Sequence, residues 1–330
     1  MSLAVAAVAA VTSIGALPLD LPVRQLPEMS FLQVLLGYAP LKVLLPLPIL
    51  AAIAPPIWWF FRPTWRELDA EAARYRMGLL ERGEVDYRPA VCFVIVAAML
   101  TMQEYYGSRA FYDEVLREPL HRFAESHRWF KAQKYDELLG YGWWSGARFI
   151  GYVLIPLPLW KLLFPKDRLV DMGLRAKGFF EHFWVYGLCL AIVLPLMLLV
   201  STQPDFGSYY PFYKTASRSW LDFMLWEAMY WLQFFSLELF FRGWMVGALR
   251  RTMGAGAIFA MALPYCMIHY GKPYFEAHGA VVAGVVLGSL SMRTRSIYAG
   301  FLVHITVAVG MDFLSLYKRA ALPITFWSPG

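Results

Sequence analysis

The chain has few charged residues for its length. Only 16% of its 330 residues are Asp, Glu, Lys or Arg, whereas about 25% is usual in soluble domains. Hydrophobic residues make up 59% of the sequence and the mean hydropathy is +0.46. This composition excludes an ordinary soluble domain and indicates an integral, multi-pass membrane protein.

Cysteine is also scarce. Cys92, Cys189 and Cys266 lie singly inside apolar runs without C-x-x-C spacing, which argues against a disulfide framework and a zinc–thiolate site. The formal net charge of +6 is modest. In membrane proteins basic residues usually mark cytoplasmic loops and lipid headgroups. We therefore expect the lipid bilayer as a partner and no nucleic acid.

The first apolar stretch lacks a preceding basic segment. Residues 3–18 are apolar, but a cleaved signal peptide normally begins with positive charges. We therefore expect a retained first span. In a bacterium, the expected location of the chain is the cell (inner) membrane.

The apolar stretches predict an all-α, polytopic transmembrane bundle with about eight or nine spans. A membrane-spanning helix needs about 20 apolar residues. The candidates are residues 3–18, 31–61, 88–104, 142–164, 181–201, 220–241, 254–270, 277–291 and 296–317. The second stretch contains five prolines, and each removes a backbone donor, so we expect it to be broken or partly re-entrant.

Two long charged loops distinguish the first part of the chain from the second. Residues 62–87 are predicted to form an amphipathic surface helix, and residues 105–139 are rich in arginine and lysine. We therefore predict N-terminal transmembrane helices with two charged loops over 1–170, and a separate core over 171–330. The basic residues of the remaining loops favour a cytoplasmic N-terminus.

Four ionisable residues lie in or beside apolar stretches of the second part. Glu238 and Arg242 are four positions apart and share a helix face, His269 ends one apolar run, and His304 lies within another. Ionisable groups at membrane depth are candidates for a functional site. A glutamate and two histidines can activate water and stabilise an oxyanion. The alternative for each is structural: an ion pair within one helix, or a histidine that bonds to a neighbouring helix.

Two further carboxylates accompany these residues. Eleven positions at 100° each bring Glu227 to within about 20° of Glu238 around one helix. Asp312 follows His304 by two helical turns. A buried Asp312 needs a partner, so we expect it to orient His304 or to pair with Arg242.

Three motifs in this order resemble those of a known family. They are Leu237-Glu-Leu-Phe-Phe-Arg242, Tyr265-Cys-Met-Ile-His269 and His304-Ile-Thr-Val-Ala308. The CPBP intramembrane proteases carry E-E-x-x-x-R, F-x-x-x-H and H-x-x-x-N/D on successive helices. Residues from about 171 to 316 resemble this family, which includes the type II CAAX prenyl endopeptidases and bacteriocin-processing or self-immunity proteins.

The resemblance implies an intramembrane endopeptidase that activates water with a glutamate. Glu238 would be the base, with Arg242 as its counter-ion. His269 would position the water and His304 would stabilise the oxyanion. Asp312 would replace a missing polar group. No cofactor is implied, although a zinc ion held by Glu238, His269 and His304 stays open as an alternative.

The sequence departs from the family motifs at two positions. Leu237 stands where the family has its first glutamate, and Ala308 where it has asparagine or aspartate. One hypothesis is an active peptidase that cleaves a membrane-anchored or prenylated peptide or protein. The second is an inactive CPBP-like membrane binding or immunity protein. A small transporter with a proton relay is the third, and the lack of an inverted repeat argues against it.

Overall fold

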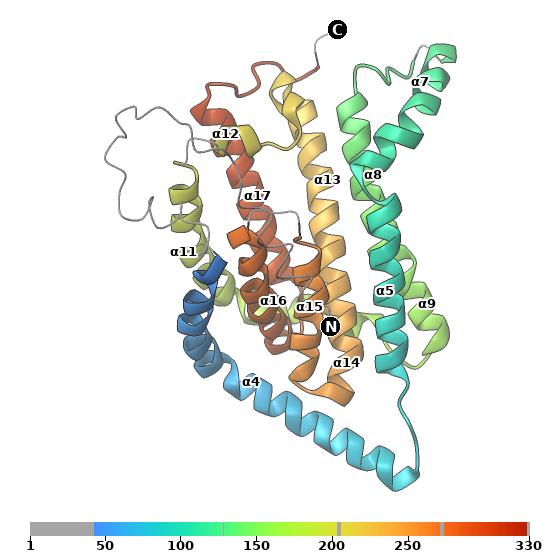
Figure 1. Ribbon diagram of the computed structural model, residues 1–330, viewed down its shortest axis with the longest axis vertical. Helices are drawn as coiled ribbons and strands as arrows, with labels where there is room; N and C mark the ends of the chain where they lie inside the picture. The colour runs from blue at the N-terminus through green and yellow to red at the C-terminus, as the bar shows by residue number, and fades with distance from the viewer. Residues whose placement is uncertain (1–42, 128, 203–205, 271–273, 329–330) are drawn as a thin grey trace, which may run out of the picture. The chain divides into compact units, whose positions relative to one another are not determined.

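The computed structural model describes residues 43–127, 129–202, 206–270 and 274–328, and its secondary structure there is helical (Figure 1). An isolated bridge between Leu174 and Ser296 is the β-type pairing within these ranges. The all-α prediction is therefore confirmed. The contacts below lie within residues 54–330, one of two units into which the chain divides.

The helices before residue 170 include two that are long and apolar enough to cross a membrane: Arg88–Tyr106 and the continuous stretch Asp136–Leu163. Two five-residue segments in this part are π-helical. The elements are α4 (Pro46–Arg82), α5 (Arg88–Tyr106), α6 (Arg109–Phe111), η1 (Tyr112–Leu116), α7 (Arg117–Ser126), α8 (Asp136–Phe149), η2 (Ile150–Leu154), α9 (Pro156–Leu163) and η3 (Leu169–Asp171).

The helices after residue 170 contain the third candidate span, α17. The elements are α10 (Ala176–Glu181), α11 (Phe183–Val200), α12 (Phe206–Tyr209), η4 (Lys214–Arg218), α13 (Trp220–Glu238), η5 (Leu239–Met245), α14 (Val246–Met253), α15 (Gly256–Met267), α16 (Tyr274–Thr294) and α17 (Tyr298–Lys318). Shorter apolar helices cover Phe183–Pro195 and Gly256–Met267.

Fewer helices satisfy the length and composition of a membrane span than the sequence suggests. Three do so in the described ranges, so the expected eight or nine spans are not confirmed. One reason is length, because the 12 residues of α15 extend only about 18 Å. The candidate span at residues 3–18 and the start of the one at 31–61 lie outside the described residues.

A turn at Leu45 precedes α4, and beyond Pro46 the proline-rich stretch is one continuous helix, so the expected break is not found in that part. Helix α4 runs from Pro46 to Arg82 through Pro55, Pro56 and Pro63. Each proline removes a single backbone donor, and helical turns on both sides keep their own hydrogen bonds. The surface helix predicted over residues 62–87 is present as far as Arg82.

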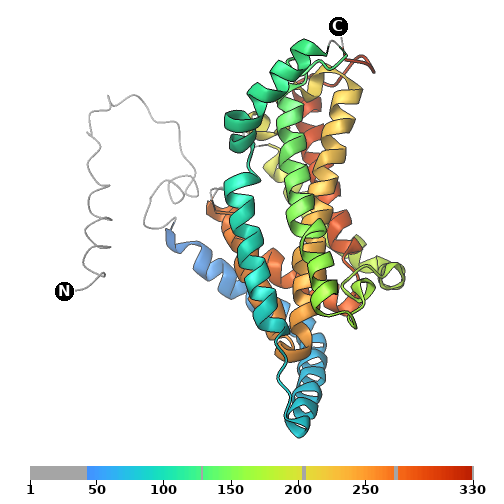
Figure 2. The same ribbon diagram turned by 90° about the vertical axis from the view of Figure 1, so that its right-hand side faces the viewer.

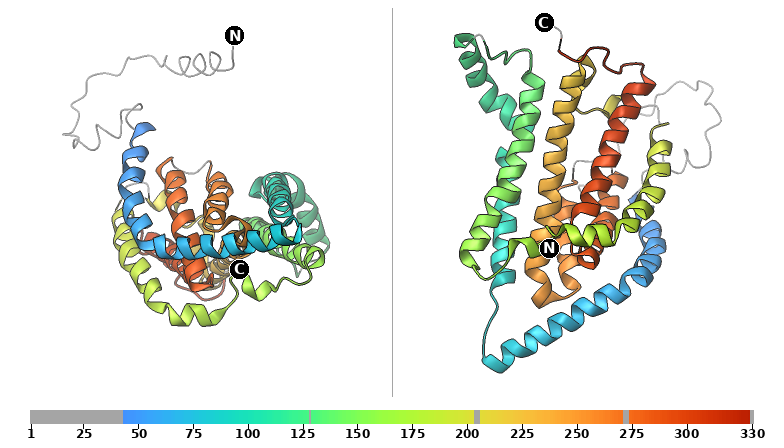
Figure 3. Two further views of the ribbon diagram at one scale, coloured as in Figure 1. Left: turned by 90° about the horizontal axis from the view of Figure 1, so that it is seen from below. Right: turned by 180° about the vertical axis from the view of Figure 1, so that it is seen from behind.

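The second half of α4 packs across the ends of the later helices (Figure 3). The Asp69 carboxylate accepts a hydrogen bond from the backbone N–H of Ala255 at 2.8 Å, and Arg76 donates to the Thr252 carbonyl at 2.7 Å. Leu68 and Ala72, one turn apart, are buried. The amphipathic pattern thus fixes α4 against the turn between α14 and α15.

Helix α13 occupies the middle of this unit and is followed directly by η5 and α14 (Figures 1 and 2). It packs on α8 and on α17. Its first turn is capped, because the Ser219 side chain accepts from the Asp222 N–H at 3.1 Å, as expected of serine at a helix start. The continuous helical run from α13 through η5 carries Glu238 and Arg242, two of the four candidate residues.

Candidate active site

Glu238 and Arg242 form an ion pair at the junction of α13 and η5. Nη1 of Arg242 lies 2.6 Å from Oε1 of Glu238, and the two side chains are 0% and 1% exposed. The four-residue spacing explains the contact, because residues four apart face each other on a helix. Segment η5 is π-helical, a local widening that recurs at functional sites.

His304 reaches the same carboxylate from α17. Its Nδ1 lies 2.9 Å from Oε1 of Glu238, and its side chain is 21% exposed. The imidazole stacks on Phe234 with 5.1 Å between the ring centroids. The structure therefore brings Glu238, Arg242 and His304 together, with His304 on the open side.

Gly300 lies one turn before His304 and faces the second oxygen of Glu238. A Cβ at this position would lie 2.8 Å from Oε2 of Glu238, which is too close for a real side chain. Glycine therefore lets the carboxylate approach the backbone of α17. The sequence prediction did not include Gly300, because a glycine four residues before His304 does not by itself indicate this contact.

His269 lies next to Tyr265, just after α15. Its Nδ1 is 2.8 Å from the Tyr265 carbonyl oxygen, and the two rings are 4.7 Å apart. The Arg242 guanidinium carbon lies 3.8 Å from the centroid of the same tyrosine ring. Tyr265 thus connects His269 with the ion pair, a part that the sequence analysis did not assign to it.

The zinc alternative is not supported by the donor set. Across the described ranges, no three His, Cys, Asp or Glu side chains gather closely enough to hold a metal ion. Glu238 and His304 supply two donors, but one Glu238 oxygen is already shared with Arg242. A tetrahedral site needs at least three protein ligands.

Asp312 lies elsewhere along α17, about 12 Å from His304 by helical rise. Its Oδ2 accepts a hydrogen bond from the Trp226 indole at 2.6 Å. Its carboxyl group interacts electrostatically with that of Glu227, and both side chains are buried. Trp226, one position before Glu227, is a partner that the sequence analysis missed.

The two positions that depart from the family motifs are packed in apolar surroundings. Leu237 is 5% exposed and belongs to the core formed with Phe240 and Trp244. Ala308 is 6% exposed and lies in a second cluster with Trp226. Neither position presents a polar group to the site.

Comparison with known proteins identifies part of this region. Residues 219–310 match the family model described as Type II CAAX prenyl endopeptidase Rce1-like. The match covers less than a third of the chain, from the cap of α13 into α17, and ends before Asp312. No match is found among curated proteins or among solved structures. The expected resemblance to the CPBP proteases is confirmed over residues 219–310.

Proposed function

We propose that this protein is an intramembrane endopeptidase that hydrolyses a peptide bond of a lipidated or membrane-anchored substrate. The observation that carries the proposal is the contact of one Glu238 oxygen with both Arg242 and His304. Charged groups in an apolar bundle are unfavourable and are retained mainly where function needs them. The family match supports the same reaction class.

Two assignments of catalytic roles to Glu238 and His304 fit the contacts. In the first, Glu238 takes the proton of water through Oε2 beside Gly300 and His304 stabilises the oxyanion. In the second, His304 takes the proton and Glu238 orients its ring. We favour the second, because Glu238 is 1% exposed whereas His304 is 21% exposed.

The favoured arrangement has a known physical basis. A buried carboxylate close to Nδ1 of a histidine stabilises the imidazolium form, so that Nε2 can act as the base; here Oε1 of Glu238 lies 2.9 Å from Nδ1 of His304. Nε2 of His304 would take a proton from the attacking water and later give it to the leaving amine. Arg242 would be the counter-ion of Glu238. His269 and Asp312 stay in the proposal as positioning residues, His269 for the water and Asp312 for α17.

The surroundings of His304 support an apolar substrate. Its open side is flanked by the half-buried ring of Phe234, which stacks on the imidazole. An apolar wall favours a lipid-modified or membrane-embedded chain over a soluble peptide. A prenylated peptide is therefore the first substrate to test, and the matched family model supports the same choice.

A cleavage assay in proteoliposomes with a fluorescent prenylated peptide tests the proposal. Glu238→Gln keeps the shape of the side chain and should lower the rate by at least about 10²-fold, as expected for a lost acid–base function. Glu125→Gln, a change at an exposed glutamate of α7, is the matched control and should leave the rate unchanged. Near-normal cleavage by Glu238→Gln contradicts the proposed site.

Chemical rescue distinguishes whether His304 or Glu238 is the base. Added imidazole should restore part of the activity of His304→Ala if His304 is the base, because the small molecule can take the same proton. It should not restore Glu238→Gln. Failure to rescue His304→Ala, at concentrations that leave the wild type unaffected, would favour Glu238 as the base.

A second candidate function is a binding protein without catalysis. The apolar packing of Leu237 and Ala308 favours it, because the family has polar residues at both positions. The same vesicles distinguish the candidates: a binding protein retains the prenylated peptide uncleaved, and Glu238→Gln leaves that retention unchanged.

A further inference from the structure

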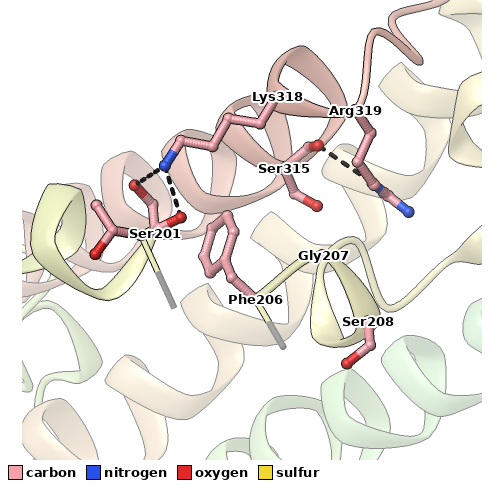
Figure 4. Close-up of a pocket in the computed structure, with 8 residues that line it drawn as sticks. Ser201, Phe206, Gly207, Ser208, Ser315, Lys318 and Arg319 are labelled. Atoms are coloured by element: carbon pink, nitrogen blue, oxygen red, sulfur yellow. Dashed lines mark hydrogen bonds between the residues drawn. The ribbon is translucent and has the colours of Figure 1, made fainter. Parts of the chain in front are cut away.

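A pocket lies at the end of α17 that is remote from His304 (Figure 4). Its volume is about 490 Å³, and it lies between Ser201 and Thr202, helix α12 and the last turn of α17. Fourteen residues separate His304 from Lys318, a distance of roughly 21 Å along the helix. The pocket is lined by Ser201, Thr202, Phe206, Gly207, Ser208, Ser315, Lys318 and Arg319.

Two cationic side chains border this pocket, and both are held by neutral groups. Nζ of Lys318 donates to the carbonyl oxygen of Ser201 at 2.6 Å and to its hydroxyl at 2.8 Å. Arg319 donates from Nε to the Ser315 carbonyl at 3.2 Å and from Nη2 to the Tyr210 carbonyl at 3.1 Å. No carboxylate pairs with Lys318 or Arg319 within the ranges that the structure describes.

Lys318 and Arg319 have more N–H donors than these contacts use. A lysine has three N–H donors and an arginine five, and each uses two in these contacts. Lys318 and Arg319 are exposed at the surface of the protein. Phosphate oxygens bind such donors strongly, because the hydrogen bonds are charge-assisted.

The frame of the pocket is buried and fixes the two cations. Ser201, Ser315 and Phe206 are 4%, 1% and 5% exposed. The ring of Phe206 lies below the side chain of Lys318, whose Nζ is 6.0 Å from the ring centroid (Figure 4). A Cβ on Gly207 would lie 3.2 Å from Cδ of Arg319, so the arginine lies close along this backbone. The pocket thus has the cationic side chains of Lys318 and Arg319 at its edges and the ring of Phe206 at its base.

The position of the pocket indicates where its ligand comes from. It lies at the last turn of α17, one of the candidate membrane spans. Tyr209 and Tyr317 are 50% and 64% exposed nearby, and exposed tyrosines are typical of the membrane–water interface. Phosphate groups of lipids are concentrated at this depth.

We propose that this pocket binds a phosphate group, supplied by the headgroup of an anionic phospholipid. Lys318 and Arg319 donate to the phosphate oxygens, and the apolar floor at Phe206 contacts the glycerol end of the lipid. Binding here needs no peptidase activity, so the proposal does not depend on the function of Glu238.

Lipid retention by the purified full-length protein tests the site. Native mass spectrometry would compare retained phosphatidylglycerol with retained phosphatidylcholine. The wild type should retain the anionic lipid preferentially. In the double variant Lys318→Gln/Arg319→Gln, the ratio of retained phosphatidylglycerol to retained phosphatidylcholine should fall by at least about tenfold. The control Arg122→Gln/Lys131→Gln removes two exposed cations from another region and should retain it. Equal retention by the double variant and the wild type overturns the proposal.

Two further experiments test whether lost binding reflects misfolding, and whether the phosphate comes from a lipid or from solution. Lys318→Arg keeps the charge and should retain the lipid, and loss of retention in this well-folded variant contradicts the charge-based site. Inorganic phosphate that stabilises the wild type, but not the double variant, in phosphatidylcholine nanodiscs would support the phosphate site and identify a soluble source. Phosphate effects that are equal in both proteins count against it.

Discussion

Replacing Arg242 by alanine removes the cation that contacts Glu238 and covers the ring of Tyr265. The arginine and glutamate side chains are 0% and 1% exposed. Breaking a buried ion pair by removing one partner typically costs about 3–5 kcal/mol, because the remaining charge stays buried. We expect a loss in this range for Arg242→Ala. Unfolding in mixed micelles of increasing denaturing detergent, followed by tryptophan fluorescence, would measure it.

Two comparisons isolate the effect of the pair. Arg122→Ala breaks an exposed pair with Glu118 and should change the free energy of unfolding by less than about 1 kcal/mol. The double variant Glu238→Leu/Arg242→Met replaces both charges by apolar groups and should lose less stability than Arg242→Ala alone. If Arg242→Ala loses no more stability than Arg122→Ala, the charge of Glu238 is compensated without Arg242, and the reasoning is wrong.

Two predictions concern the cleavage rate in proteoliposomes. Gly300→Ala places a Cβ against Oε2 of Glu238 and should lower the rate by roughly 10²-fold, the effect of about 1 Å of misplacement. Gly146→Ala is the control, because a Cβ there meets nothing within 4 Å. Equal cleavage rates for the two variants would refute the contact of Gly300 with Glu238. Ala308→Asn should raise a weak wild-type rate, since an oxyanion donor is typically worth about 10²–10³; an inert variant that still binds the prenylated peptide favours the binding protein.

The parts of the site that follow from local geometry could be predicted from the sequence. The pair Glu238–Arg242 needs only a helix, since residues four apart share a face. The contact of His304 with Glu238 depends on how α17 packs beside α13. Motif order in a known family supplied that expectation, because spacing within one helix carries no information about its neighbour.

Other features could not be read from the sequence because they depend on packing. The number of spans could not be read from the apolar runs alone, because some of them form short helices such as α15. The approach of Gly300 to Glu238 is set by the distance between two helices. A glycine in an apolar run is common, and only the packed neighbour shows that a side chain would not fit.

The position of Asp312 illustrates the same limit and affects how mutants should be interpreted. Helices α13 and α17 are antiparallel, because Glu238 meets His304 near the start of α17, whereas Trp226 meets Asp312 further along it. Polar contacts therefore tie the two helices at two levels. Trp226 and Glu238 are about 18 Å apart by helical rise, and His304 and Asp312 about 12 Å.

A substitution at Asp312 removes the acceptor of a buried indole, and an unsatisfied buried donor costs about 1–3 kcal/mol. Loss of activity in Asp312→Ala could thus follow from a shift of α17 that moves His304 away from Glu238. Asp312→Asn keeps an acceptor for Trp226 and removes the charge. If Asp312 acts only by fixing α17, Asp312→Asn should cleave at the wild-type rate while Asp312→Ala does not; equal losses in both would assign a role to the charge itself.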